Sequence, residues 1–312
     1  MSKPHRIIFG GYQGPNSVHT RGAGYFAAAL HRLTDGAAEI LLRPDITRDG
    51  HKAADLLPMV EAGEIHGCYF SSSYMSGRVP SLTLFDMPFA APARDDLFAR
   101  LDGALGDWIA ADVAARTGFE VMGYWDNGLR HISAKRKLAT PDDCAGLSLR
   151  TLASDDHQRV FRALGFDPRV IDVKDLVAAV ASGEVDAQEN PLTNIYNFGL
   201  HDAQPEITLT GHLQGVAPVW FHRDTVAGWP DDLRRAVRAA LREASDAQRG
   251  YALSDDTACA ESLRAAGAHL HSLTDRQSSA FRDAVSAQNA QTRARIDPGA
   301  LQLFEQPQEI TA

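Results

Sequence analysis

Arg150 is the side chain in this sequence best suited to binding a small molecule. Residues 147–151 (LSLRT) alternate apolar and polar types, which predicts a strand with Arg150 near its carboxyl end. Open α/β sheets bind ligands at that edge, and the guanidinium fork of arginine matches a carboxylate with two parallel hydrogen bonds. Arginine is costly to bury unless an anion meets it, so Arg150 is either a carboxylate clamp or half of a structural salt bridge.

Other polar side chains follow predicted strands in a similar way. Arg130 comes just past a strand predicted over residues 118–125, where the chain could cross between two lobes. Residues 71–74 (SSSY) end the strand predicted over 67–70, and their hydroxyls either line a cleft or cap the next turn. Residues 186–191 (DAQENP) follow Arg150 by about forty residues, and 188–191 (QENP) are predicted to form a turn after a short strand.

The order of the predicted elements indicates an α/β protein with a mostly parallel sheet. Hydrophobic periodicity predicts strands over residues 6–9, 39–42, 67–70, 118–125, 147–151, 169–171, 185–187 and 269–271, with two short strands within 206–221. It predicts helices over residues 18–33, 95–116, 155–164, 174–182, 229–266 and 275–296. The helix over 229–266 is long enough to bridge two lobes.

Length and composition favour a two-lobed globular protein. The 312 residues suit two lobes of about 150 residues, and 44% of the residues are hydrophobic and 23% charged. The formal net charge of −9 disfavours nucleic acid or an anionic membrane as a partner, because both demand a basic face. The cysteines, at 68, 144 and 259, are far apart and no metal-ligand spacing occurs, so no disulfide framework, metal site or cofactor is expected.

The N-terminal residues carry no apolar signal segment before the first predicted strand. Two alternatives follow from this beginning. Either the protein stays in the cytoplasm, or the sequence is a mature form that was given a start methionine.

Four motifs together resemble one family of transport proteins. They are residues 127–130 (NGLR), residues 140–150 (TPDDCAGLSLR), residues 183–191 (GEVDAQENP) and residues 209–212 (LTGH). Their order and spacing are similar to those of the substrate-binding proteins of tripartite ATP-independent periplasmic (TRAP) transporters, of the DctP type. The resemblance implies a periplasmic-binding-protein-like fold with a hinge, and a ligand cleft between two lobes that close on binding. We expect lobe I to comprise 1–127 and about 216–255, and lobe II to comprise 128–215 and about 256–312.

The resemblance also implies which residues contact the ligand. By position, Arg150 resembles the main carboxylate-binding arginine, Asn190 an amide that helps to hold the same group, and Arg130 a second basic contact. Tyr12 and Ser72 fall where the sialate receptors have an amide and an acid, which makes a polyhydroxylated sialate doubtful. A smaller or aromatic body is favoured by the remaining side chains near the cleft, which are Ser71, Ser73, Tyr74, Phe89 and Trp125. His19 is also expected near the cleft, and Glu189 is expected to bond backbone or to cross the hinge.

The function that this family resemblance implies is a receptor for a small organic acid. It would work in the periplasm, close around its ligand and deliver it to the membrane permease subunits, without a cofactor. The alternative is a cytoplasmic lyase or isomerase on the same scaffold, with an acid or base supplied by His19, His131, Lys174 or His212. A third possibility is a ligand-sensing module that uses the same cleft. Turnover of a bound acid would favour the enzyme.

Overall fold

The strands join into one mixed sheet that runs through the whole molecule. A computed structural model describes residues 3–306. Within these residues the sheet has nine strands in the order β2-β1-β3-β8-β4-β7-β5-β6, and β9 pairs with β8. The strands are β1 (His5–Gly10), β2 (Ala38–Arg43), β3 (Gly67–Tyr69), β4 (Phe119–Ala134), β5 (Ser148–Thr151), β6 (Asp167–Val170), β7 (Ala187–Pro191), β8 (Glu206–His222) and β9 (His269–Ser272).

Helices cover the sheet and follow the predicted βα alternation. The α-helices are α1 (Val18–Leu33), α2 (Leu56–Glu61), α3 (Arg94–Leu101), α4 (Ala104–Arg116), α5 (Pro141–Cys144), α6 (Asp155–Ala163), α7 (Val173–Ser182), α8 (Leu192–Asn197), α9 (Arg223–Ala227), α10 (Asp231–Ala265), α11 (Asp275–Arg293) and α12 (Pro298–Glu305). The 3₁₀ helices are η1 (Ile46–Asp49), η2 (Ala53–Asp55), η3 (Ser72–Met75), η4 (Pro80–Asp86) and η5 (Leu200–Asp202). No helix among residues 3–306 is both long and apolar enough to cross a membrane.

Two lobes can be defined by separate hydrophobic cores. The first lobe packs β1, β2 and β3 against α1, α2 and α4 around a large cluster that includes Phe9, Phe26 and Phe221. The second lobe packs β5, β6 and β7 with α6 and α7 around two smaller clusters, one of which includes Phe161. β5 pairs in parallel with both β6 and β7. Each lobe therefore buries apolar side chains in a core of its own, and the cleft lies between these cores.

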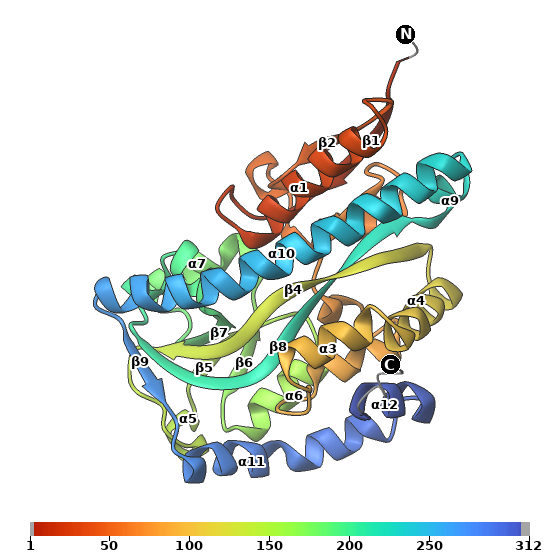
Figure 1. The fold of residues 1–312 in the computed structure, drawn as a ribbon. Helices are drawn as coiled ribbons and strands as arrows, with labels where there is room; N and C mark the ends of the chain where they lie inside the picture. The colour runs from red at the N-terminus through yellow and green to blue at the C-terminus, as the bar shows by residue number, and fades with distance from the viewer. Residues whose placement is uncertain (1–2, 307–312) are drawn as a thin grey trace.

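The two lobes share β4 and β8, which pair antiparallel over most of their length. The sequence predicted a strand over 118–125 and two short strands within 206–221, but each region is one long strand. The polar residues after Trp125 interrupt the alternation of residue types that predicts a strand. In the structure β4 continues through them, with register shifts that include one between Asp126 and Leu129. Gly128 has φ +79° at this shift, which a side chain would strain. Figure 1 shows both strands sweeping across the molecule beneath α10.

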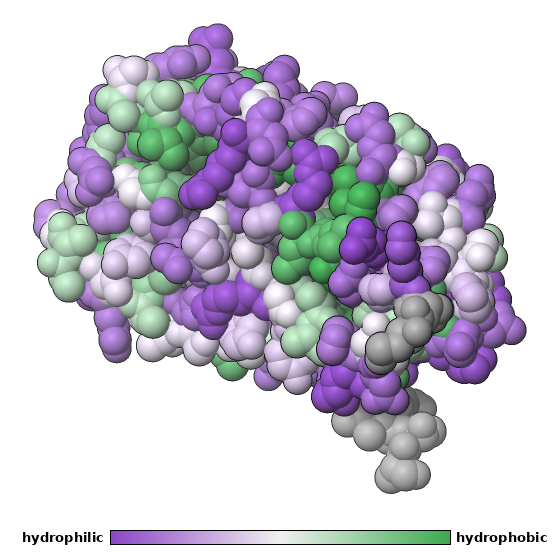
Figure 2. All heavy atoms as spheres, turned by 90° about the horizontal axis from the view of Figure 1, so that it is seen from above, coloured by the Kyte–Doolittle hydropathy of each residue, from purple (hydrophilic) through white to green (hydrophobic). Residues whose placement is uncertain are grey.

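The predicted bridging helix is α10, whose 35 residues extend for about 52 Å. Its N-terminal half, with Leu241, belongs to the first core, and its C-terminal half, with Leu263, belongs to the second. The helix predicted over 95–116 is instead two helices, because the backbone of Gly103 leaves the helical region between α3 and α4. Figure 2 shows polar residues over most of the face seen from above, with apolar residues gathered in separate patches.

The last helix corrects the expected extent of lobe II. Residues 256–312 were expected there, and α11 does pack into a second-lobe core through Phe281. α12, however, packs against α3 and α4, and its Phe304 belongs to the first core, 6.2 Å between ring centroids from Phe85. Figure 1 shows α12 close to α4. The helix predicted over 275–296 ends before α12, so the sequence pattern did not predict that the chain packs again into the first core.

Candidate functional site

Arg150 lies on β5, at the second-lobe wall of the cleft, and is fully buried. Its Nε donates to the carbonyl oxygen of Ile171 at 2.9 Å. Its terminal nitrogens, Nη1 and Nη2, are also buried and have no hydrogen-bond partner among the described residues. No described carboxylate lies within ion-pair distance of this guanidinium. The structural salt bridge that was the alternative for Arg150 is therefore absent from residues 3–306, and the fork remains available to an anion.

Arg130 differs from Arg150 because its charge is already met by Glu189. Arg130 Nε lies 2.5 Å from Glu189 Oε2, and Nη2 lies 2.7 Å from Oε1. His212 Nε2 is 3.3 Å from the same carboxylate. Burial alone would raise the pKa of the Glu189 carboxyl, but Arg130 and His212 together hold that pKa below its ordinary value. The expected second basic contact is thus one half of a buried ion pair that links β4 to β7.

Asn190 stands between this ion pair and the outer part of the cleft. Its Oδ1 lies 3.5 Å from Arg130 Nη2 and accepts from Asn194 Nδ2 at 3.2 Å. Its Nδ2 donates to Gln188 Oε1 at 2.6 Å. Gln188 in turn donates to Ser133 Oγ at 2.6 Å, so the amide is held by a chain of buried hydrogen bonds. A side chain fixed in this way is suited to orienting a ligand group without rearrangement.

Tyr12 and Tyr74 form the first-lobe wall that faces the two arginines. Both rings pack on Phe70, with centroids 5.1 Å and 4.5 Å away. Burial raises the pKa of each phenol, while Arg130 and Arg150 act in the opposite direction, which places both hydroxyls near both guanidiniums. The phenols are therefore neutral, and each can donate or accept a hydrogen bond.

Ser72 and Ser73 border a small inner cavity between the lobes. The cavity has a volume of about 10 Å³ and its wall includes Ser72, Ser73, Asn127, Arg130, Leu152 and His157. Ser73 also donates to Asp86 Oδ1 at 2.6 Å. The serines thus line the inner cavity, and no side chain caps the 3₁₀ helix η3 at its N-cap Ser71, so the capping alternative is not observed.

A buried pair that the sequence analysis did not identify joins the lobes beside this cavity. Asp86 lies in η4 of the first lobe and His157 in α6 of the second, and Asp86 Oδ1 is 3.0 Å from His157 Nε2. Ser154, the N-cap of α6, lies 3.2 Å from Asp86 Oδ2. The available signal was that Asp86 is the one acid in the apolar run 84–89. Its partner is 71 residues away in sequence, which local patterns cannot connect.

His19 and Trp125 are corrections to the expected site. His19 stacks on Tyr69 with ring centroids 4.8 Å apart, and Trp125 lies 5.5 Å from the same ring. Neither lines the inner cavity or the outer pocket described next, because both fill the aromatic core of the first lobe. Burial lowers the pKa of His19 to about 3, so the ring is neutral near neutral pH. The helical position of His19 and the strand position of Trp125 were predicted, but not the direction of either side chain.

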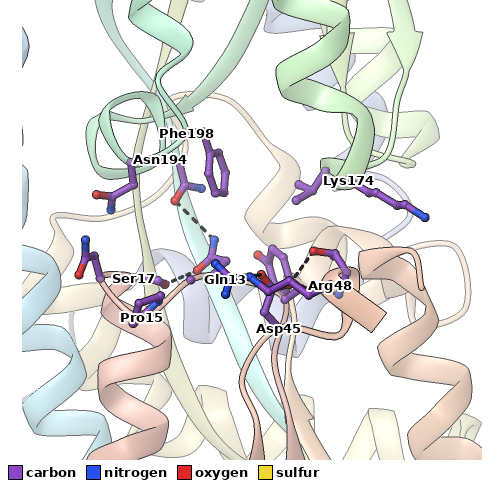
Figure 3. Close-up of a pocket in the computed structure, with 14 residues that line it drawn as sticks. Gln13, Pro15, Ser17, Asp45, Arg48, Lys174, Asn194 and Phe198 are labelled. Atoms are coloured by element: carbon purple, nitrogen blue, oxygen red, sulfur yellow. Dashed lines mark hydrogen bonds and ion pairs between the residues drawn. The ribbon is translucent and has the colours of Figure 1, made fainter. Parts of the chain in front are cut away.

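An outer pocket of about 380 Å³ lies between the lobes where Tyr12 reaches it. Figure 3 shows the first-lobe residues Gln13 and Asp45 opposite Asn194 and Lys174 of the second lobe. Gln13 Nε2 lies 3.4 Å from Asn194 Oδ1. Both lobes contribute polar side chains to the wall of this pocket.

Asp172 connects the lobes at the edge of this pocket. Its Oδ1 accepts from the backbone nitrogen of Lys174 at 3.0 Å, as the N-cap of α7. The same oxygen accepts from Ala53 N at 3.1 Å across the cleft, and Oδ2 lies 3.5 Å from Ala54 N. One carboxylate therefore meets the N-terminus of α7 in the second lobe and that of η2 in the first lobe.

The residues considered for an enzyme do not form one constellation. His131 Nδ1 accepts from Gly211 N at 3.1 Å, and burial lowers its pKa to about 3. Lys174 Nζ instead donates to the carbonyl of Gly50, and His212 belongs to the Glu189 pair. Among residues 3–306, no group of three or more His, Cys, Asp or Glu side chains is arranged to hold a metal ion. His131, Lys174 and His212 thus make separate hydrogen bonds among the described residues.

Known proteins are similar to this chain in sequence over most of its length. The model of family 7 of the bacterial extracellular solute-binding proteins, DctP, matches residues 9–294. The C4-dicarboxylate-binding periplasmic protein DctP of Rhodobacter capsulatus is 24% identical over 95% of this chain and 89% of that protein. The 2,3-diketo-L-gulonate-binding periplasmic protein YiaO of Escherichia coli is 26% identical over 91% of this chain and 86% of that protein.

A solved structure of a similar protein supports the same family assignment. The TRAP periplasmic solute-binding protein of Sulfurospirillum deleyianum, crystallised with succinate, superposes with a TM-score of 0.90. The two are 28% identical, and the match covers 99% of this chain and all of the other. The predicted two-lobed α/β fold and the predicted family are thereby confirmed. The chain belongs to family 7 of the bacterial extracellular solute-binding proteins, the DctP family, and is a solute receptor of the TRAP transporter type, not an enzyme.

Proposed function

We propose that this receptor binds a small organic acid whose carboxylate is held by Arg150. The observation that supports this is the buried guanidinium whose Nη1 and Nη2 have no partner among the described residues. Two parallel hydrogen bonds from a guanidinium fork fit a carboxylate. Asn190 and the phenols of Tyr12 and Tyr74 surround the same space and supply further donors. Arg130 acts indirectly, because Glu189 holds it and it in turn orients Asn190.

The expected energetic contribution of Arg150 is large because both partners are desolvated. Truncating one member of a buried charge pair costs about 2–5 kcal/mol, which corresponds to a roughly 30- to several-thousand-fold loss of affinity. Arg150 also contributes to selectivity against neutral molecules, since these would leave the guanidinium buried and unpaired.

Closure around the acid follows from contacts that only the closed arrangement allows. Asp172 bonds Ala53 across the cleft, and Gln13 meets Asn194. A ligand that touches both lobes favours this state by its differential contacts. We infer that the closed receptor works in the periplasm, like the periplasmic binding proteins of Rhodobacter capsulatus and Escherichia coli to which it is similar, and delivers the acid to membrane permease subunits.

The test is a thermal-shift screen of the purified chain against aliphatic, hydroxy, keto, aromatic and sugar acids and dicarboxylates. A ligand at a hundred times its dissociation constant stabilises the native state by about 2.7 kcal/mol, which is easily detected. Hits should disappear in Arg150→Met. Arg169→Met is the matched control, because Arg169 occupies the paired position on the neighbouring strand β6 but is exposed. Hits that persist in Arg150→Met would contradict the proposal.

A further inference from the structure

Residues 87–94 leave the first core, reach the second lobe and return, and we call this segment the interlobe strap. Phe85, which precedes the strap, and Leu97, which follows it in α3, both belong to the first core. Between them the ring of Phe89 packs against a second-lobe core, and the guanidinium carbon of Arg282 on α11 lies 5.7 Å from the ring centroid. A movement of one lobe relative to the other must therefore bend the strap or pull Phe89 out of this core.

Two hydrogen bonds hold the middle of the interlobe strap. Asn289 Nδ2 on α11 donates to the carbonyl oxygen of Pro88 at 2.8 Å. The backbone nitrogen of Phe89 donates to the carbonyl oxygen of His212 on β8, also at 2.8 Å. The ring of His212 lies 3.3 Å from the Glu189 carboxylate. The strap is thus fixed to the same residue that helps to hold the buried ion pair of the cleft.

Phe89 has a backbone conformation that a side chain disfavours. Its φ is +60°, and the backbone nitrogen of Ala90 donates to the carbonyl oxygen of Met87 at 3.3 Å. Pro88 in second place and a positive φ in third place is the order of a type II turn, whose third position favours glycine. A residue with a Cβ in the left-handed region lowers an equilibrium constant by a factor of about 5 to 30. The contacts that offset this strain come from α11, β8 and the second-lobe core.

The interlobe strap has room to change its conformation. Phe89, Ala91 and Pro92 line a pocket of about 480 Å³, whose wall also includes Leu129 of β4 and Leu253 of α10. These last two elements cross between the lobes, so the pocket lies at the hinge. The strap can therefore change its backbone on this side without displacing a packed core.

We propose that the interlobe strap is a strained connection that favours separation of the lobes when no ligand is bound. In the closed arrangement, in which Asp172 bonds Ala53 across the cleft, the second lobe holds Phe89 at positive φ. When the lobes part, the ring leaves its core and φ relaxes, which favours the open form. The contacts of a ligand with both lobes must outweigh this strain, so closure depends more strongly on the ligand. The inference rests on the lobe closure proposed above, and not on the choice of acid.

The test measures how often the lobes close without ligand. Gln13→Cys and Asn194→Cys place two thiols where the lobes meet, because Gln13 Nε2 lies 3.4 Å from Asn194 Oδ1. The native cysteines are buried. The rate at which a short bismaleimide joins the two thiols, relative to labelling of each alone, reports the closed population. Phe89→Gly should crosslink about 5- to 30-fold faster than Phe89→Ala, because both lack the ring and only glycine is unstrained at this φ.

Asp35 provides the matched control. It is the other non-glycine residue with a positive φ among residues 3–306, at +47°, and it lies exposed in the turn between α1 and β2 of the first lobe. Asp35→Gly should resist urea better than Asp35→Ala, but the two should crosslink at the same rate. At position 89 we expect the reverse. Phe89→Gly should crosslink faster and yet be no more stable than Phe89→Ala, because the open form is free of the strain and glycine gains more entropy on unfolding.

The outcomes separate this inference from the receptor function. Equal crosslinking of Phe89→Gly and Phe89→Ala would overturn the proposal, since the strain would then be the same in both arrangements. Slower crosslinking of Phe89→Gly would reverse its sign. If Phe89→Ala does not fold, Phe89→Asn against Phe89→Ser gives a second comparison, because asparagine tolerates the left-handed region better than serine. No acid is present, so a failure here leaves binding through Arg150 intact, and binding that is indifferent to Arg150 leaves this result intact.

Discussion

Arg150 and Arg169 are directly paired on the adjacent parallel strands β5 and β6, yet their surroundings are opposite. Arg169 is exposed and lies 2.6 Å from the carboxylate of Asp167, whereas Arg150 is fully buried and meets no described carboxylate. The same residue type thus serves a solvated ion pair on one strand and, as we propose, a ligand site on the next. An exposed pair of this kind contributes little to stability.

The unpaired guanidinium predicts a conflict between stability and binding at Arg150. Arg150→Met should remove ligand binding and yet raise the free energy of unfolding of the ligand-free protein by about 1–3 kcal/mol, because a buried unpaired charge is replaced by an apolar side chain. Urea unfolding without ligand measures this, with Arg169→Met as the control that changes stability by less than about 0.5 kcal/mol. A clear loss of stability in Arg150→Met would show that the guanidinium is satisfied in the folded protein.

The buried pair of Arg130 and Glu189 predicts a strong dependence of each side chain on the other. Glu189→Gln should lower the free energy of unfolding by about 3–5 kcal/mol, because Arg130 is left as an uncompensated buried charge. Replacing both residues by methionine should recover most of that loss. Denaturant unfolding of Arg130→Met, Glu189→Met and the variant with both substitutions forms a double-mutant cycle. Additive losses in the cycle would contradict a coupled pair.

The lowered pKa of Glu189 predicts how stability depends on pH. The folded protein holds this carboxyl ionised below 4.5, where the unfolded chain already takes up a proton. Stability from this group is therefore fully present above that pH and is lost as the pH falls toward the lower folded pKa. The difference in unfolding free energy between wild type and Glu189→Gln should be constant from about pH 7 to pH 5 and should shrink below about pH 4. A difference in unfolding free energy that grows as the pH falls below 4 would contradict this prediction.

The bridging carboxylate of Asp172 predicts an effect on ligand release. Asp172→Ala should shorten the lifetime of the complex about tenfold, since the closed state loses the bonds to Ala53 and Ala54, which are each worth about 0.5–1.5 kcal/mol. Thr274→Ala is the matched control, because Thr274 caps α11 in the same manner but its cap bonds stay within that helix. Stopped-flow release of a bound acid separates the two variants. Equal release rates would show that Asp172 is only a helix cap.

Much of the fold could be predicted from local patterns. Helix α1 has the predicted limits, and β5 with Arg150 lies where the alternation of residues 147–151 placed it. Continuous pairing of β4 with β8 could not be predicted, because bulges interrupt the alternation that a strand normally shows. The return of α12 to the first core depends on packing between distant segments, which no local pattern encodes.

The position of Arg150 near the end of a strand could be predicted from the alternation of residue types, whereas its role as a carboxylate clamp stays a prediction. The site was not predictable where a partner from another element decides the role of a residue. Arg130 was predicted to contact the ligand, but its guanidinium is paired with Glu189. His157 was not predicted as a site residue, because its partner Asp86 is distant in the sequence. Trp125 and His19 occupy predicted elements, but the packing of the first core turns their rings away from the cleft.

The position of α12 in the first core bears on the order in which this protein can fold during synthesis. Phe304 packs beside Phe85, and Arg100 donates to the carbonyl of Phe304, so the lobe that begins with β1 is completed by a helix that follows the second lobe in the sequence. N-terminal domains usually fold first as a chain emerges from the ribosome. Here the N-terminal lobe must wait for the other lobe and for α12, so its core cannot be completed before the second lobe has been made.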